Sequence, residues 1–227
     1  MKLSLVEKRK EAGDAVSFVF KPAAPFSWQA GQFLHYTLPH ANPDDRKTER
    51  YFTISAAPFE NRVMLTTRLV EKKSTFKEAL SALPVGGAIE ADGLEGDFVV
   101  DDPTAGLILI AGGIGITPFR AILLDLDKKG VPINATLLYA NRDNDFVYKD
   151  ELEALARKHT NFKIHYFVTP EKIDEQAIRN AAPDLSKPVF YVSGPEPMVE
   201  AFEKMMLGMG ITEPHLKRDY FPGYNWP

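Results

Sequence analysis

The residues best placed to do chemistry lie in one stretch, GLILIAGGIGITPF, at residues 106–119. Its run of aliphatic residues, 107–110, predicts a strand buried on both faces, as in the centre of a parallel sheet. The glycines that follow, Gly112, Gly113 and Gly115, predict a tight turn into a helix. Because the first backbone N–H groups of a helix have no partners within it, such a turn favours the binding of a diphosphate.

The residues after this turn predict a helix over 117–129, with apolar side chains at helical spacing. Pro118 suits its first turn, where a missing N–H costs nothing. No Gly-Lys-Ser/Thr sequence follows, which excludes a P-loop, and Thr117 and Pro118 stand where the dinucleotide fingerprint has its third glycine. Taken alone, the turn is equally well explained by tight packing between a strand and a helix.

A second candidate site is the strand that begins with Arg50, Tyr51, Phe52 and Thr53. The alternation of a strand sends Arg50 and Phe52 to one face, and Tyr51 and Thr53 to the other. A guanidinium near an aromatic ring and a hydroxyl suits a ligand with both a phosphate and a ring system. A surface arginine beside a buried aromatic residue is the alternative interpretation.

Two weaker positions could bind phosphate. Ser74 and Thr75 begin a short predicted helix, where they could hold a phosphate or simply cap the helix. Arg142 follows the predicted strand 135–140 and could meet a ribose phosphate, although a solvated arginine would look the same.

The end of the last predicted parallel strand provides Ser193, Gly194 and Pro195. In an open α/β sheet, ligands lie beyond the carboxyl ends of the strands, so these residues are expected to face the same crevice as the glycine turn. A plain turn between strand and helix explains them as well. The aromatic tail, 219–226, is expected to dock on the core or over a planar cofactor.

Composition narrows the classes of function. The chain has 227 residues, a formal net charge of −4 and no long run of like charge, so nucleic acid is not an expected partner. The absence of cysteine excludes disulfides, thiolate zinc sites and a chain-borne iron–sulfur cluster. The histidines show no metal-ligand spacing, so no metal is expected. No apolar run is long enough to span a membrane, and a cytoplasmic location is the expectation.

The hydrophobic pattern predicts two domains. Residues 1–101 are β-rich and predict an antiparallel β-barrel, whereas residues 102–227 alternate strands with helices and predict an α/β domain with a parallel sheet. Predicted strands of the barrel cover 16–20, 32–38, 51–55 and 63–70, with one helix near 74–83. Strands of the second domain are predicted at 107–111, 135–140, 162–168 and 188–193, with helices at 117–129, 148–158, 174–180 and 195–207.

Taken together, these motifs resemble those of the ferredoxin–NADP reductase superfamily, in the same order and over nearly the whole chain. The matching residues are Ala30-Gly31-Gln32-Phe33, then Arg50 with Phe52 and Thr53, then Thr66 and Thr67 with Ser74-Thr75, then Gly112 through Pro118, and finally Ser193 through Met198.

The resemblance implies an FAD cofactor bound by the barrel, NAD(P)H as electron donor, and hydride transfer between them. It implies that Arg50 holds the flavin diphosphate, that Phe52 packs on the isoalloxazine, and that Phe221 or another aromatic residue of the tail covers its other face. Thr53 and Ser193 are implied next to the reacting atoms. The full implied cofactor-binding set is Arg50, Tyr51, Phe52, Thr53, Thr66, Thr67, Ser74, Thr75, Gly112, Gly113, Gly115, Thr117, Pro118, Arg142, Gly194, Pro195, Met198 and Phe221.

The chain departs from the family at two site positions, with Phe52 in place of tyrosine and Ser193 in place of cysteine. Asp219 is a candidate for the carboxylate that some members use. The resemblance implies a reductase that passes electrons to a separate acceptor, either a protein or a small molecule. Two alternatives are a reductase that uses free flavin as its substrate and a non-catalytic nucleotide-binding subunit. Alanine at Gly113 or Gly115 is expected to weaken NAD(P)H binding.

Overall fold

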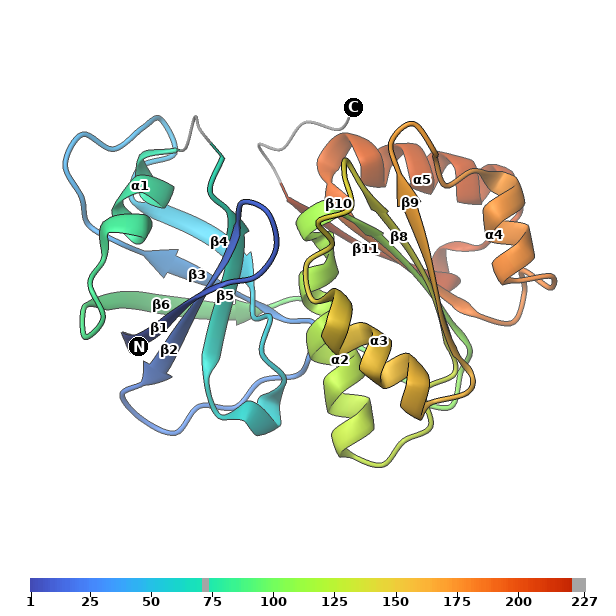
Figure 1. The fold of residues 1–227 in the computed structure, drawn as a ribbon, viewed down its shortest axis with the longest axis horizontal. Coiled ribbons are helices and arrows are strands. Elements are labelled where there is room, and N and C mark those ends of the chain that lie inside the picture. The colour runs from blue at the N-terminus through green and yellow to red at the C-terminus, as the bar shows by residue number, and fades with distance from the viewer. Residues whose placement is uncertain (71–73, 222–227) are drawn as a thin grey trace.

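The computed structural model describes residues 1–70 and 74–221, which form two domains side by side (Figure 1). The first domain is an antiparallel sheet that curls around its own core, closed on one side by a short helix. Its strands are β1 Lys2–Lys10, β2 Ala15–Pro22, β3 Phe33–Thr37, β4 Glu49–Thr53, β5 Val63–Arg68 and β6 Ala88–Glu95, and its helix is α1 Thr75–Ala82. The strand order is β4-β3-β6-β1-β2-β5.

The two edges of this sheet meet just after β4. The backbone N–H of Ser55 donates to the carbonyl of Met64, in β5, at 2.8 Å. Helix α1 buries Phe76 and Leu80 in the core, and the side chain of Ser74 caps its first turn as the sequence predicts. The predicted antiparallel barrel is therefore confirmed as a curled six-stranded sheet.

The second domain is a parallel sheet with helices on both faces (Figure 1). Its strand order is β11-β10-β7-β8-β9, and all neighbouring pairs are parallel. The strands are β7 Leu107–Gly112, β8 Ala135–Asn141, β9 Phe162–Val168, β10 Val189–Pro195 and β11 Leu216–Phe221. The helices are α2 Thr117–Lys128, α3 Lys149–Lys158, α4 Glu175–Ala181 and α5 Glu196–Gly208.

Strand β7 shows why both faces of this sheet must be covered. Leu107 and Leu109 point into the core shared with α2 and α3, whereas Ile108 and Ile110 point into the core under α4 and α5. All four are buried, as the aliphatic run predicts. The predicted α/β domain is confirmed.

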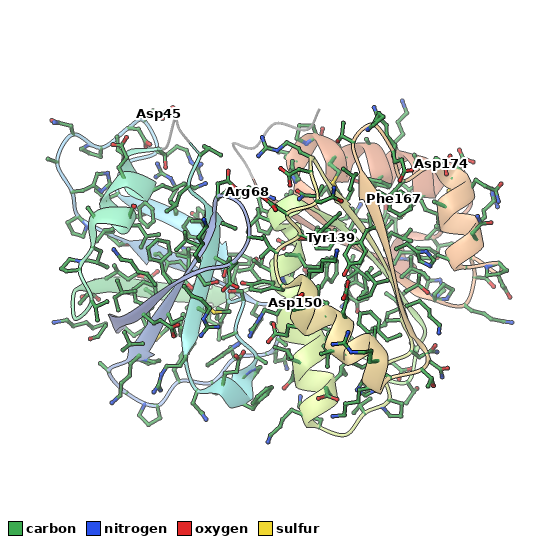
Figure 2. All side chains as sticks on the ribbon, viewed as in Figure 1. Asp45, Arg68, Tyr139, Asp150, Phe167 and Asp174 are labelled. Carbon is green, nitrogen blue, oxygen red and sulfur yellow. The ribbon has the colours of Figure 1, made fainter. Side chains whose placement is uncertain are left out.

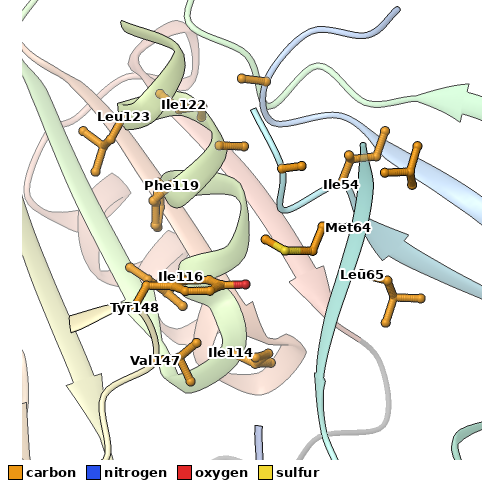
Figure 3. Close-up of a cluster of buried hydrophobic side chains, with 14 of the residues drawn as sticks. Ile54, Met64, Leu65, Ile114, Ile116, Phe119, Ile122, Leu123, Val147 and Tyr148 are labelled. Atoms are coloured by element: carbon orange, nitrogen blue, oxygen red, sulfur yellow. The ribbon is translucent and has the colours of Figure 1, made fainter. Parts of the chain in front are cut away.

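One hydrophobic core runs through both domains. Figure 3 shows Ile54 and Met64 of the barrel across from Ile116 and Phe119 at the start of α2. Inter-domain surfaces within a chain are usually more polar than this, so the continuous core holds the domains in a defined arrangement. Residues 96–106 connect the two sheets, and the predicted boundary near residue 101 stays a prediction. No helix among the described residues is long and apolar enough to cross a membrane.

The chain contains a strand where the sequence predicted only a tail. Residues Leu216–Phe221 form β11, which pairs with β10 along its whole length. The first residues of the predicted tail, from Asp219 to Phe221, are thus part of the sheet. Tyr224 and Trp226 lie outside the described residues.

Candidate functional site

The glycine turn connects β7 to α2 through a short 3₁₀ helix, Gly113–Ile116. Gly113 has φ +54°, a left-handed conformation that glycine adopts without penalty. Its carbonyl accepts a hydrogen bond from Tyr139 Oη at 3.0 Å, and Thr117 Oγ1 donates to the carbonyl of Ile114 at 3.1 Å. The turn is therefore held rigidly from within the protein. The predicted helix start at Thr117 and Pro118 is confirmed.

Gly115 is needed for a reason that the sequence did not reveal. A Cβ atom there would lie 2.1 Å from the carbonyl oxygen of Ser193, on the neighbouring strand β10. Gly112 and Gly194 are also close, since a Cβ on Gly194 would lie 3.3 Å from the Cα of Gly112. The glycines thus allow the turn and the end of β10 to pack backbone against backbone. This brings the residues predicted from two separate motifs together.

Three polar side chains from both domains meet where β4 and β10 end. Ser193 Oγ donates to Asp219 Oδ2 at 3.2 Å, and the two residues are partners in the β10–β11 register. The hydroxyl of Thr53, the last residue of β4, faces the same carboxyl from the barrel. Burial raises the pKa of Asp219 to about 6, against the lowering effect of these two hydroxyls. Thr53, Ser193 and Asp219 are hereafter called the domain-crossing triad.

Arg50 lies at the start of β4 with its guanidinium buried. Its Nη2 donates to both carboxylate oxygens of Asp44, at 2.6 and 2.7 Å, and its Nη1 donates to the carbonyls of Arg46, Lys47 and Glu49. Both bonds to the carboxylate come from one nitrogen, and they are charge-assisted hydrogen bonds of the kind with which arginine binds carboxylates and phosphates. The site is therefore built for an oxyanion, and in this conformation a carboxylate of the chain itself occupies it.

The start of α1 adjoins the same site. Thr75 Oγ1 accepts a hydrogen bond from the backbone N–H of Asp44 at 3.0 Å and lies 3.0 Å from His40 Nε2. Ser74 Oγ accepts from the backbone N–H of Lys77 at 3.4 Å. Thr75 thus contacts the backbone of Asp44 and Arg50 contacts its carboxylate, so the structure brings the two predicted residues to the same loop residue.

Strand β4 alternates as predicted. Phe52 shares a face with Arg50 and packs against Phe76 and Tyr36, with ring centroids 5.9 Å apart in both pairs. Tyr51 is on the other face, 54% exposed, with its ring edge against His35. Phe52 is therefore the aromatic ring of this motif that lies beside the arginine, and Tyr51 points away from it.

Strand β5 carries Thr66 and Thr67, for which cofactor binding stays a prediction. The hydroxyl of Thr66 hydrogen-bonds Tyr148 Oη, from the second domain, and lies 2.7 Å from Ser17 Oγ and 2.9 Å from Ser55 Oγ. Thr67 is fully buried. The structure therefore places Thr66 in a polar network between the domains rather than beside Arg50.

Met198 and Phe221 also have neighbours within the protein. Met198 is fully buried in the core under α5, and its sulfur would lie 3.0 Å from a Cβ on Gly194. This is a packing position rather than a ligand-facing one. Phe221 is the last residue of β11, pairs with Pro195 and is half-buried against the shared core.

Arg142 is exposed at the end of β8, with its Nη2 3.9 Å from Asp14 of the barrel. The sequence missed its neighbour Arg68, which is buried at the end of β5 (Figure 2). Arg68 donates to Asp14 Oδ1 at 2.6 Å and to Asn141 Oδ1 at 2.9 Å, and it lies close to Gly113. Only its place in a β-rich strand was visible in the sequence. Its cation faces the glycine turn from the other domain.

Within residues 1–70 and 74–221 no cluster of three or more histidines and carboxylates could hold a metal ion. The geometry defines a class of two-domain protein with an oxyanion site on one domain, a glycine turn suited to a diphosphate on the other and a polar triad between them.

Comparison with known proteins supports this class. Residues 109–204 match the oxidoreductase NAD-binding domain family. The chain is 33% identical over 191 residues, 78% of its length, to the reductase component DmpP of phenol 2-monooxygenase from Pseudomonas sp. strain CF600, covering 53% of that protein. It superposes on the cytochrome b5 reductase domain of Ulva prolifera nitrate reductase with a TM-score of 0.80, 25% identity and 96% coverage of both chains. The FAD/NAD-binding domain of Vibrio cholerae nitric oxide dioxygenase gives a TM-score of 0.84 at 21% identity, with coverage of 97% and 98%.

The chain has the two-domain fold of the ferredoxin–NADP reductases, as its motifs predict. Several of its relatives are named as reductases, reductase components or reductase domains, which supports the predicted class, a flavoprotein reductase. The chain spans between 43% and 65% of the length of the first curated relatives that it matches.

Proposed function

We propose that this protein is an NAD(P)H-dependent reductase that binds FAD at the barrel and passes electrons to a separate acceptor. The observation that carries the proposal is the domain-crossing triad. Thr53 ends the strand that carries the oxyanion site at Arg50, and Ser193 lies near the end of the strand packed against the glycine turn. A ligand on each domain would therefore meet its counterpart at this triad.

The barrel offers a matching set of groups for FAD. Arg50 already binds a carboxylate and the start of α1 lies beside it, so the donors of both suit the oxygens of a flavin diphosphate. Phe52, half-buried on the same face as Arg50, offers a ring for the isoalloxazine. The roles of Tyr51, Thr66 and Thr67 carry less support.

The second domain offers the nucleotide site. The turn at Gly112, Gly113 and Gly115 presents the start of a helix to a diphosphate, with Thr117 and Pro118 fixing its geometry. Gly194 and Pro195 flank it, and Arg142 is available for a phosphate on the ribose. Phe221 lies beside Pro195, next to the triad.

Bound flavin supplies the ability to accept a hydride and release electrons singly. The chain's own residues orient and tune the site. Ser193 and Thr53 direct their hydroxyls to Asp219, so a charged Asp219 fixes both hydroxyls in one orientation. Its raised pKa also makes Asp219 able to hold or release a proton near neutral pH.

One observation favours the second candidate, a reductase for which flavin is a loosely held substrate. FAD must displace the Asp44 carboxylate from Arg50 before its diphosphate can take that place. The exchange replaces the Arg50–Asp44 pair by a pair between Arg50 and the diphosphate. Because one charge-assisted interaction is lost as another forms, the net free energy gained when FAD binds is smaller. The acceptor's identity is open in both cases, although the phenol 2-monooxygenase relative is a reductase component.

An anaerobic visible spectrum tests the function directly. We expect the purified protein, supplied with FAD, to show flavin bands that bleach on addition of NADPH or NADH. The nucleotide that bleaches the flavin bands faster is the physiological electron donor. Retention of FAD on gel filtration indicates a resident cofactor, whereas loss of FAD with turnover of added flavin indicates the second candidate. If nucleotide binds without bleaching the flavin bands, the protein is a non-catalytic nucleotide-binding subunit.

The substitution Asp44→Asn tests the oxyanion site. We expect it to lower the FAD dissociation constant by about 10-fold, because the neutral amide no longer competes for Arg50. Riboflavin, which has no phosphate, should bind equally to both proteins by fluorescence quenching. Asp45→Asn is the matched control, since Asp45 is exposed at the same loop (Figure 2). Weaker FAD binding by Asp44→Asn would instead mean that Asp44 orients Arg50.

A further inference from the structure

Arg120 is a buried cation that joins the two domains. It lies in the first turn of α2, directly after the glycine turn, and is 3% exposed. A guanidinium has five N–H donors, and here they make five hydrogen bonds. Two go to Glu60, at 2.8 and 3.1 Å, two go to Glu151, at 2.7 and 3.0 Å, and one goes to the carbonyl of Ser55 at 2.8 Å.

These partners belong to different domains. Glu151 is on α3, in the same domain as Arg120, whereas Glu60 and Ser55 are in the barrel. Ser55 comes two residues after Thr53 of the domain-crossing triad. One side chain therefore connects the helix that starts at the glycine turn with the strand end that carries Thr53.

The surroundings make this connection rigid. The guanidinium lies over the ring of Tyr148, 5.1 Å from its centroid, and the apolar core of Figure 3 adjoins it. Burial alone would lower the pKa of Arg120, but Glu60 and Glu151 outweigh it and hold the pKa above its ordinary value. The cation is permanently charged, so it always needs both carboxylates. Tyr148 Oη adds a second tie to the barrel through Thr66 and Ser17.

We propose that Arg120 is a positioning residue for hydride transfer, which sets the distance and angle between the flavin site and the nicotinamide site. This inference rests on the proposed function. Arg120 acts through Ser55 and Glu60 on the barrel and through α2 on the glycine turn, without touching either ligand. Reactions of this kind are sensitive to small displacements, since a shift of about 1 Å can cost on the order of 10²-fold in rate.

The test compares Arg120→Lys, Arg120→Gln and Glu60→Gln with the wild type as FAD-loaded proteins. In anaerobic stopped-flow measurements we expect the limiting rate of flavin reduction to fall by roughly 10- to 100-fold. The dissociation constants for FAD and NAD(P)H should stay within about twofold, because neither ligand site has lost a group. The long-wavelength absorbance that arises when nicotinamide stacks on flavin should weaken in parallel.

Two controls separate positioning from folding. Glu151→Gln leaves the hydrogen bonds from Arg120 to Ser55 and Glu60 of the barrel intact. It should therefore slow flavin reduction less than Glu60→Gln does, even if the two substitutions lower the thermal unfolding temperature equally. Arg179→Gln, at an exposed site on α4, should match the wild type. Equal rates in wild type and the Arg120 variants, or equal effects of Glu60→Gln and Glu151→Gln, would overturn the inference. If NAD(P)H does not reduce the flavin of the wild-type protein, the proposed function is overturned, and the inference that rests on it is overturned as well.

Discussion

The substitution Gly115→Ala should lower the free energy of unfolding by about 3 kcal/mol, because it forces a methyl group into an occupied space. The new Cβ would lie 2.1 Å from Ser193 O, 2.5 Å from Ser193 C and 2.7 Å from Gly194 N. All three are backbone atoms of β10, in the middle of the parallel sheet, so none can move aside like the end of a flexible side chain. The collision therefore displaces either the turn or the strand.

Urea unfolding measures this effect, with Gly208→Ala as the matched control. Gly208 ends α5 and a Cβ there would meet nothing within 4 Å. Alanine at that position should be neutral or stabilise the protein by roughly 0.5–1 kcal/mol. An unfolding free energy of Gly115→Ala close to that of the wild type would show that the turn and β10 can separate. The expected selective loss of nucleotide affinity is then better sought in Gly113→Ala, where a Cβ meets no atom closer than 3.8 Å and only the strain of a left-handed φ of +54° opposes alanine.

The predictions from sequence succeeded where a local pattern determines the structure. The aliphatic run of β7, its glycine turn and the helices that follow were placed within a residue or two. Strand β1 was missed because only Leu3 and Leu5 are buried, and its second half is a row of exposed polar side chains. Strand β11 was missed because it lies at the edge of the sheet. An edge strand tolerates charged residues, and Lys217 and Arg218 are half-buried there.

The site shows the same limit. Arg50, Thr53, the glycines and Ser193 were found because each lies in a recognisable local motif. Arg68, Arg120 and Tyr148 were not, because each has a partner in the other domain, between 60 and 82 residues away along the chain. Whether a charged or phenolic side chain is buried depends on its contacts with the other domain. The spacing of residues along the chain does not predict these contacts.

The substitution Asp219→Asn should make the protein more stable at neutral pH while impairing it as a reductase. The folded state raises the pKa of Asp219 from 3.8 to about 6. Between these values the folded protein keeps a proton that the unfolded chain loses, so the contribution of this group to stability falls as pH rises. Above pH 6 the loss is complete and amounts to about 3 kcal/mol, whereas below about pH 4 both states are protonated and nothing is lost. The stability gained by Asp219→Asn should therefore appear between these pH values and level off above them.

The rate of flavin reduction should move in the opposite direction. A charged Asp219 accepts from the hydroxyls of both Ser193 and Thr53, and an asparagine amide can replace at most one of these contacts without turning a donor toward the other. We expect the limiting rate to fall by about 100-fold in Asp219→Asn, and the wild-type rate to rise with pH through about 6, a transition that the variant lacks. Asp184→Asn, at an exposed site, provides the control for both measurements. A variant that gains stability above pH 6 but keeps the wild-type rate would leave Asp219 as a buried carboxylate with no part in the reaction.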